Sequence, residues 1–238
     1  MPVPRKMRCE VSKVVDHGEH VHSVFLTPEK RLPRFLPGQF LHLALDPYDP
    51  SSFWPESRVF SIASSPADQQ CVRITYAVKG KFTTRMEKEL IAGKEVWVKL
   101  PYGEFIINNS VDVVLFAGGT GITAFSAYLD QLEPDQKNSI NIFYGARNFD
   151  LLIYRSMIDH KIEICPKLNA WYFAEDGHPQ EDHEMKGKLS VRSAFNCLKK
   201  PLEREYYLSG PPGMLQALRE DLIQRCISPD LIKIDSWE

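Results

Sequence analysis

The sequence has few cysteines and no two of them at close spacing. Its five cysteines are scattered through 238 residues, with no C-x-x-C pair and no iron–sulfur spacing. The sequence therefore predicts neither a disulfide framework nor a metal centre built from cysteines, and it favours a reducing, cytoplasmic setting. The cysteines are Cys9, Cys71, Cys165, Cys197 and Cys226.

Long hydrophobic runs and an excess of charge of one sign are also missing. No stretch approaches the roughly 18 apolar residues of a membrane span, and the N-terminal residues contain no apolar signal core. The formal charge of −2 gives no general attraction to nucleic acid or to an anionic membrane. With 43% apolar and 25% charged residues, the composition is that of a soluble globular protein with one large domain or two smaller ones.

The first hundred residues contain short segments of strand composition separated by Pro, Gly and Asp clusters. Six such strands predict a small antiparallel β-barrel. One helix is expected among them, from Thr83 or Thr84 to Ile91, with a threonine as its N-cap and Gly93 beyond its end. The six expected strands are 9–15, 21–26, 40–45, 58–63, 71–78 and 95–100.

After residue 105 the pattern changes to longer apolar strands that alternate with helical segments. Residues 111–117 form a nearly continuous apolar run, which is typical of a parallel strand buried on both faces. A glycine turn, a helix over 123–132 and a second buried strand over 139–144 follow. This alternation continues to residue 226 and predicts a doubly wound α/β domain. We expect domains at 1–108 and 109–238, with an exposed polar loop over 175–186.

One predicted strand carries Arg58, Val59, Phe60 and Ser61. Alternation places Arg58 and Phe60 on the same face. An arginine fork pairs well with a diphosphate, an aromatic ring can stack on an isoalloxazine, and the Ser61 hydroxyl can hydrogen-bond flavin N5. The pattern therefore suggests a flavin site, although four such residues also fit an ordinary edge strand.

A second candidate site is the segment 80–84, where a predicted strand ends and the predicted helix begins. Glycine permits close approach of the backbone, and the free N–H groups at a helix start attract an anion. A phosphate bound here could also meet Arg58. The alternative is a plain turn with a threonine cap. The residues expected to contact the cofactor are Tyr76, Val78, Gly80, Lys81, Phe82, Thr83 and Thr84.

A third glycine-rich turn follows the buried strand 111–117 and opens a helix. This context suits the diphosphate of a dinucleotide, and a simple packing turn is the alternative. The residues of this loop are Gly118, Gly119, Thr120, Gly121 and Ile122.

Together these motifs resemble the ferredoxin–NADP reductase superfamily over nearly the whole chain. Residues 58–61 match the family pattern R-x-(Y/F)-(S/T), and residues 80–83 match G-x-x-(S/T). Residues 37–40 are similar to its P-G-Q-(F/Y) turn, 102–105 to the join between its domains, and 118–123 to its nucleotide loop. The resemblance implies FAD in the barrel and NAD(P)H in the second domain, although FMN is not excluded.

The resemblance also implies roles for residues near the C-terminus. Ser209, Gly210, Pro211 and Met214 lie in a segment similar to the family motif C-G-P-P-x-M, with serine in place of the usual cysteine. Ser209 should lie beside the nicotinamide. Asp235 and Trp237 match a terminal acid and aromatic of the family, which implies proton relay by Asp235 and stacking of Trp237 on the flavin. A tryptophan that fills a domain interface is the alternative.

Three charged residues bear on which nucleotide binds. Arg147 follows one strand of the α/β domain and could hold a 2′-phosphate. Glu175 and Asp176 follow the next strand and would repel it, whereas a carboxylate suits a free ribose hydroxyl. The sequence thus favours NADH and leaves NADPH possible.

The resemblance implies a flavoprotein reductase that passes a hydride from NAD(P)H to FAD, and then electrons to a separate acceptor. Because no iron–sulfur segment is present, we expect that acceptor to be another protein, such as a ferredoxin or an oxygenase component. Two alternatives stay open: a reductase that uses flavin as a substrate, and a nonenzymatic electron-transfer or redox-sensing subunit. His17, His20 and His22 lie close in sequence, but a turn between strands explains them better than a metal site.

Overall fold

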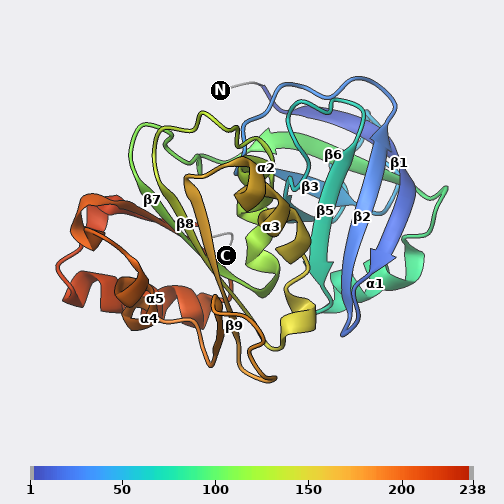
Figure 1. Ribbon diagram of the computed structural model, residues 1–238. Coiled ribbons are helices and arrows are strands. Elements are labelled where there is room, and N and C mark those ends of the chain that lie inside the picture. The colour runs from blue at the N-terminus through green and yellow to red at the C-terminus, as the bar shows by residue number, and fades with distance from the viewer. Residues whose placement is uncertain (1–2, 236–238) are drawn as a thin grey trace. The chain divides into compact units, whose positions relative to one another are not determined.

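The computed structural model describes residues 3–235. The chain divides into two compact units, Met1–Ile106 and Ile107–Glu238. The first is an antiparallel barrel of six strands and the second is a parallel α/β sheet of six strands (Figure 1). This confirms the predicted fold class. Within residues 3–235, no helix has the length and apolar character needed to cross a membrane.

The first unit is a single sheet with the strand order β4-β3-β6-β1-β2-β5, in which all neighbours are antiparallel. Its two edges meet just beyond β4, where the Ala63 amide donates to the Arg73 carbonyl of β5 at 2.8 Å. The sheet therefore closes into a barrel. Its strands are β1 (Arg5–Asp16), β2 (Val21–Pro28), β3 (Phe40–Ala44), β4 (Ser57–Ser61), β5 (Val72–Ala77) and β6 (Glu95–Tyr102).

The barrel interior follows from the alternation of each strand. On β1, Met7, Cys9 and Val11 are buried while the residues between them are exposed. A side-chain period of two turns every second residue inward. Helix α1 (Lys81–Glu89) adds Phe82 and Met86 to the same apolar core. The helix is thereby anchored to the barrel by its buried face.

The predicted N-cap of α1 was wrong. Gly80, with an extended backbone, is the N-cap, and the helix begins at Lys81 and ends at Glu89. Thr83 is the third helical residue. Its hydroxyl accepts hydrogen bonds from the amides of Lys79 (2.9 Å) and Gly80 (3.1 Å). Thr83 thus satisfies two backbone N–H groups that precede the helix, although it lies inside the first turn. A threonine at the N-cap position is not needed for this.

Two of the matched motifs pack against each other inside the barrel unit. Gly38 has a φ of +92°, and a Cβ there would lie 1.9 Å from the Phe105 carbonyl oxygen. The buried Gln39 side chain accepts from the Leu36 amide at 2.9 Å and donates to the Gly103 carbonyl at 3.0 Å. The segments 37–40 and 102–105 therefore serve the architecture of the barrel.

The second unit is a parallel sheet with the strand order β10-β9-β8-β7-β11-β12. Every residue of β7 is buried, as expected for a central strand covered on both faces. The two short edge strands, β10 and β12, were not predicted because three residues carry no readable alternation. The strands are β7 (Val113–Gly118), β8 (Ile140–Ala146), β9 (Leu168–Ala174), β10 (Glu184–Lys186), β11 (Glu205–Ser209) and β12 (Ile232–Ile234).

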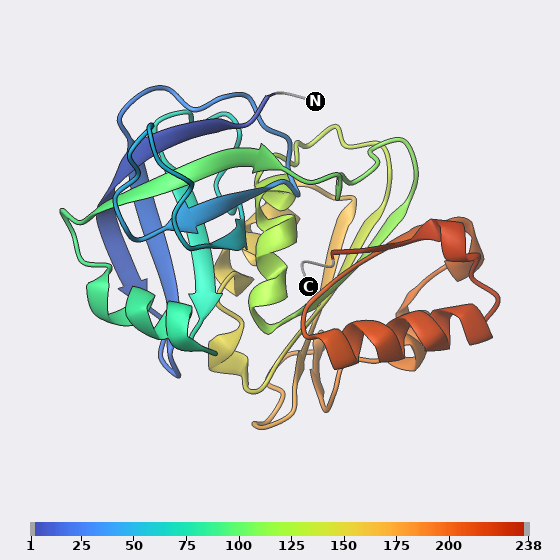
Figure 2. The same ribbon diagram turned by 180° about the vertical axis from the view of Figure 1, so that it is seen from behind.

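Helices cover both faces of this sheet. Helices α2 (Thr123–Asp130) and α3 (Arg155–Ile164) lie on one face, and α4 (Val191–Cys197) and α5 (Pro212–Gln224) lie on the other (Figures 1 and 2). Apolar residues of α4 and α5 share one core with the phenylalanines of β7, β8 and β9. Before α3, residues 149–151 form a separate 3₁₀ turn, capped by the Asn148 side chain.

The prediction of an exposed loop over residues 175–186 was wrong for its last three residues. Residues 184–186 form β10, and Glu184 is only 9% exposed. Its carboxylate pairs with Arg155 of α3, whose guanidinium also lies 2.9 Å from Glu181. The buried glutamate is tolerated because it is paired. The polar residues 184–186 therefore form an edge strand, which the ion pair with Arg155 anchors to α3.

Candidate flavin and nucleotide sites

In the barrel unit, strand β4 and the start of α1 come together. The guanidinium carbon of Arg58 lies 5.2 Å from the centre of the Phe82 ring. Arg58 is half-exposed, donates to the Ser57 carbonyl and pairs with Glu56 at 3.0 Å. Arg58 thus lies beside the first turn of α1. Its guanidinium is paired with the exposed Glu56 carboxylate, which a stronger anion could replace.

The other predicted flavin residues of this unit lie around the same strands. Phe60 packs nearly perpendicular to the Tyr76 ring, with centres 6.2 Å apart. Both Phe60 and Val78 are partly buried against the barrel core. In the β3–β4 register, Val59 pairs with His42 and Ser61 with Phe40, so their side chains point to the opposite side of the sheet from Arg58 and Phe60.

The first turn of α1 suits an anion. Its first turn contains no acidic residue, and a helix start presents amides that have no acceptor within the helix. A Cβ on Gly80 would meet no heavy atom within 4 Å, so the space above the turn is open. A diphosphate binds to helix amides and to a guanidinium where the backbone leaves room for it. The first turn of α1 has such amides, open space at Gly80 and the nearby Arg58. The residues of this turn fit the diphosphate of a flavin nucleotide.

In the α/β unit, the predicted nucleotide loop lies where the strand order reverses. The chain moves from β7 outward through β8 and β9, and then returns to β11 on the other side of β7. Ligands of open α/β sheets bind beyond the carboxyl ends of the strands at such a reversal. The loop forms a 3₁₀ turn, η1 (Gly119–Ile122), between β7 and α2.

Three glycines allow this loop to pack against the segment that follows β11. A Cβ on Gly121 would lie 2.5 Å from the Ser209 carbonyl oxygen. A Cβ on Gly118 or on Gly210 would lie 2.6 Å from atoms of Met214. Gly119, in contrast, has a φ of +53° and open space where its Cβ would be. Gly118, Gly121 and Gly210 thus serve close packing, whereas Gly119 leaves open space beside the loop.

Ser209 and Asp235 form a buried pair. The Ser209 hydroxyl donates to the Asp235 carboxylate at 2.9 Å, and the two residues are 3% and 6% exposed. The Asp235 amide donates to the Leu208 carbonyl at 2.9 Å, which fixes the chain beyond β12 beside β11. Two residues expected to act near the nicotinamide are therefore in direct contact. Trp237 lies outside the described residues.

The residues expected to choose the nucleotide are also neighbours. The Asp176 amide donates to the Arg147 carbonyl at 2.8 Å, and the Glu175 amide to the Ala146 carbonyl at 3.4 Å. The Glu175 carboxylate lies 3.6 Å from Lys188, which the sequence did not single out. Glu175 and Asp176 are both exposed. The ends of β8 and β9 thus bring the backbone of Arg147 next to that of Glu175 and Asp176.

The three histidines of the β1–β2 hairpin do not converge on one another but contact two other side chains. His17 bonds to Ser23 at 2.8 Å, whereas His20 and His22 both contact Glu87 of α1. Within residues 3–235, no group of three or more His, Cys, Asp or Glu residues is arranged to hold a metal ion. Glu87 was missed in the sequence, although it lies one helical turn beyond Thr83.

Known proteins resemble this chain in sequence. Residues 115–220 match the family model described as the oxidoreductase NAD-binding domain. The reductase component of phenol 2-monooxygenase from Pseudomonas sp. strain CF600 is 28% identical, over 91% of this chain and 61% of that protein. The reductase component of propane 2-monooxygenase from Mycolicibacterium smegmatis is 26% identical, over 97% of this chain and 67% of that protein. The chain spans about two thirds or less of these relatives.

Solved structures resemble it in fold. The FAD/NAD-binding domain of nitric oxide dioxygenase from Vibrio cholerae superposes with a TM-score of 0.82 at 20% identity, covering 96% of this chain and 97% of that domain. A ferredoxin reductase of carbazole 1,9a-dioxygenase gives 0.75 at 22% identity, covering 100% and 70%.

The chain thus has an antiparallel barrel followed by a parallel α/β sheet, which is the fold of a ferredoxin–NADP reductase-like module. Within it, residues 115–220 match an oxidoreductase NAD-binding domain.

Proposed function

We propose that this protein is an NADH-dependent flavoprotein reductase with FAD bound in the barrel unit. The observation that carries the proposal is the meeting of Arg58 with the first turn of α1, 5.2 Å from Phe82. That pairing of a guanidinium with helix amides provides for a diphosphate, which FAD has and FMN lacks. A diphosphate site also favours a retained FAD over a flavin that binds and leaves as a substrate.

In this proposal each unit has a distinct task. Bound FAD would supply the chemistry, because a flavin accepts two electrons from a reduced nicotinamide and can pass them on singly. Phe60 would pack against the isoalloxazine, supported from the core by the buried Tyr76. The backbone of Ser61, whose side chain faces the other side of β4, would lie at the level of the flavin N5. The glycine loop 118–122 would hold the dinucleotide, with Ser209, fixed by Asp235, shaping the space for the nicotinamide.

We further propose that the electron acceptor is a separate protein, such as a ferredoxin or an oxygenase component. Support comes from the relatives, two of which are named as reductase components of monooxygenases.

Anaerobic titration of the purified protein with NADH tests the proposal. We expect the protein to stay yellow after desalting, and NADH to bleach the flavin band at roughly 450 nm within seconds, faster than NADPH does. Loss of the colour on desalting would instead favour a flavin reductase. Retained flavin that neither nucleotide bleaches would rule out the reductase and favour a redox-sensing subunit.

The preference for NADH should depend on Glu175 and Asp176. The double variant Glu175→Gln/Asp176→Asn removes two carboxylates beside Arg147, so a 2′-phosphate should no longer be repelled. We expect the NADPH affinity to rise about 5- to 10-fold relative to that of NADH, on the order of 1 kcal/mol for exposed charges. Steady-state KM values for both nucleotides measure this. Asp182→Asn, an exposed residue farther along the same loop, should leave the ratio unchanged, and an equal change in both variants would contradict the assignment.

A further inference from the structure

The hairpin between β1 and β2 has an unusual backbone. Gly18, Glu19 and His20 all have positive φ angles, of +81°, +46° and +60°. L-residues other than glycine adopt this left-handed conformation at a cost and seldom in succession. Such a conformation persists only where surrounding contacts enforce it, and it is found at functional sites more often than elsewhere. The contacts of His20 are therefore of interest.

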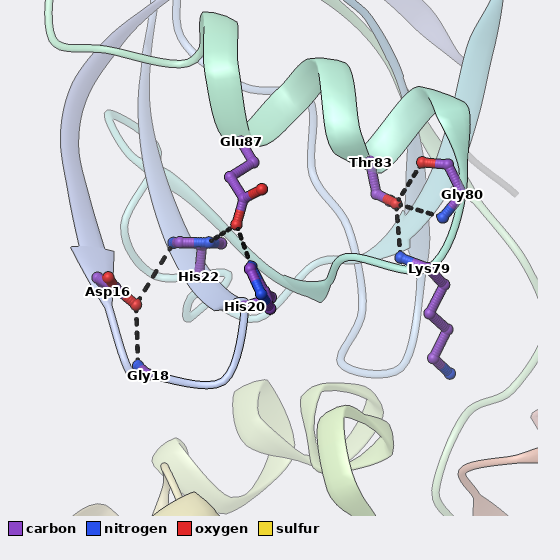
Figure 3. A network of polar contacts seen from close by, with 8 residues as sticks. All are labelled: Asp16, Gly18, His20, His22, Lys79, Gly80, Thr83 and Glu87. Carbon is purple, nitrogen blue, oxygen red and sulfur yellow. Dashed lines mark hydrogen bonds and ion pairs between the residues drawn. The ribbon is translucent and has the colours of Figure 1, made fainter.

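His20 binds both sides of the turn that precedes α1 (Figure 3). Its carbonyl accepts from the amide of Val78, just beyond β5, at 3.0 Å. Its imidazole Nδ1 lies 2.8 Å from Oε1 of Glu87 on α1. The residues between these two anchors include Lys79, Gly80 and Thr83, which form the proposed phosphate turn.

Glu87 joins this hairpin to the phosphate turn. One oxygen, Oε1, contacts both His20 and, at 3.1 Å, Nε2 of His22. Thr83 lies one helical turn before Glu87 and so on the same side of α1, where its hydroxyl accepts from Lys79 and Gly80 (Figure 3). A shift of α1 relative to the hairpin would therefore move the turn amides.

Charge makes this contact depend on pH. Donating a hydrogen bond to the Glu87 carboxylate raises the pKa of His20 above its ordinary value, and the two imidazoles lower the pKa of Glu87. The ion pair is complete between these two pKa values, and it is lost as pH rises through the raised pKa of His20. The neighbouring ionisable groups are Asp16 at the end of β1, His17 just beyond it, His22 of β2 and Tyr76 of β5.

Two of these neighbours do not gain charge at neutral pH. Burial lowers the pKa of His17 and raises the pKa of Tyr76 far above the neutral range. The raised pKa of His20 extends its positive charge toward alkaline pH.

We propose that His20 and Glu87 are positioning residues that hold the first turn of α1 in the conformation that binds the FAD diphosphate. The inference rests on the proposed function, since it assumes that FAD binds at this turn. Neither side chain needs to touch the cofactor. Their ion pair fixes the amides of 79–83, and its loss on deprotonation of His20 would loosen them.

The test is the dissociation constant of FAD from pH 6.0 to 8.5, measured with deflavinated protein by quenching of flavin fluorescence. In the wild type we expect the constant to rise about 3- to 10-fold over this range, with a midpoint above 6.5, the ordinary pKa of histidine. His20→Asn keeps a residue that tolerates the left-handed backbone. Its constant should be raised about 3- to 10-fold at pH 6.0, and it should change less with pH than that of the wild type, since His22 keeps its contact with Glu87. Glu87→Gln should behave in the same way.

A control variant and two contrary outcomes distinguish a wrong positioning role from a wrong proposed function. His160→Asn removes an exposed histidine of α3 that faces Glu163 at 3.7 Å, and it should retain the wild-type profile. A pH profile in His20→Asn that matches the wild type, or a flat wild-type profile, would overturn the positioning role while leaving FAD binding intact. Failure of the wild type to bind FAD at any pH would instead remove the proposed function, and this inference with it.

Discussion

Replacing Arg58 with alanine is expected to weaken FAD binding by about 30- to 100-fold. A charge-assisted hydrogen bond contributes about 2–3 kcal/mol, and each 1.4 kcal/mol is tenfold in affinity. Removal of the guanidinium would also leave the Glu56 carboxylate, now 3.0 Å from Arg58, without that cation and near the proposed diphosphate. The measurement is the FAD dissociation constant of deflavinated protein, by fluorescence quenching or calorimetry.

Two further variants sharpen this prediction. Arg58→Lys keeps the charge but not the planar fork, so its affinity should lie between those of wild type and Arg58→Ala. Arg34→Ala removes an exposed arginine of the same unit and should bind FAD as the wild type does. If Arg58→Ala and Arg34→Ala bound FAD equally well, the diphosphate would have to lie elsewhere.

The second large effect is expected from Gly121→Ala. The added Cβ would lie 2.5–2.6 Å from three backbone atoms of Ser209 and Gly210, and β11 is held between β7 and β12. The backbone has little room to yield, so we expect a loss of at least about 3 kcal/mol in unfolding free energy. Thermal unfolding followed by circular dichroism should show a midpoint roughly 10 °C lower.

The matched control is Gly213→Ala in the first turn of α5. A Cβ there meets no heavy atom within 4 Å, and alanine is the better helix former, so its midpoint should be equal to or above that of the wild type. The FAD affinity of Gly121→Ala should stay within about twofold of wild type, because every residue of the proposed diphosphate site lies in the barrel unit. An unchanged midpoint in Gly121→Ala would show that the loop has another conformation.

Local patterns account for what could be predicted. The apolar run before Gly118 and the alternation of strands such as β1 depend on residues next to one another in sequence, so fold class and motif order were readable. Where the signal was short or misleading, prediction failed. The three-residue strand β10 is polar because its glutamate pairs with Arg155, 29 positions earlier, and Thr83 satisfies the amides of its turn from within the helix.

The sequence by itself determined the two-part architecture and the order of the candidate cofactor motifs, since both depend on periodicity and on glycine, proline and threonine at fixed offsets. Only the tertiary structure decided which side chains meet. Ser209 reaches Asp235 across 26 positions and His20 reaches Glu87 across 67. Such contacts depend on strand register and helix docking, which no local pattern records. For that reason the pair that fixes Ser209 and the ion pair beside the phosphate turn emerged only from the folded chain.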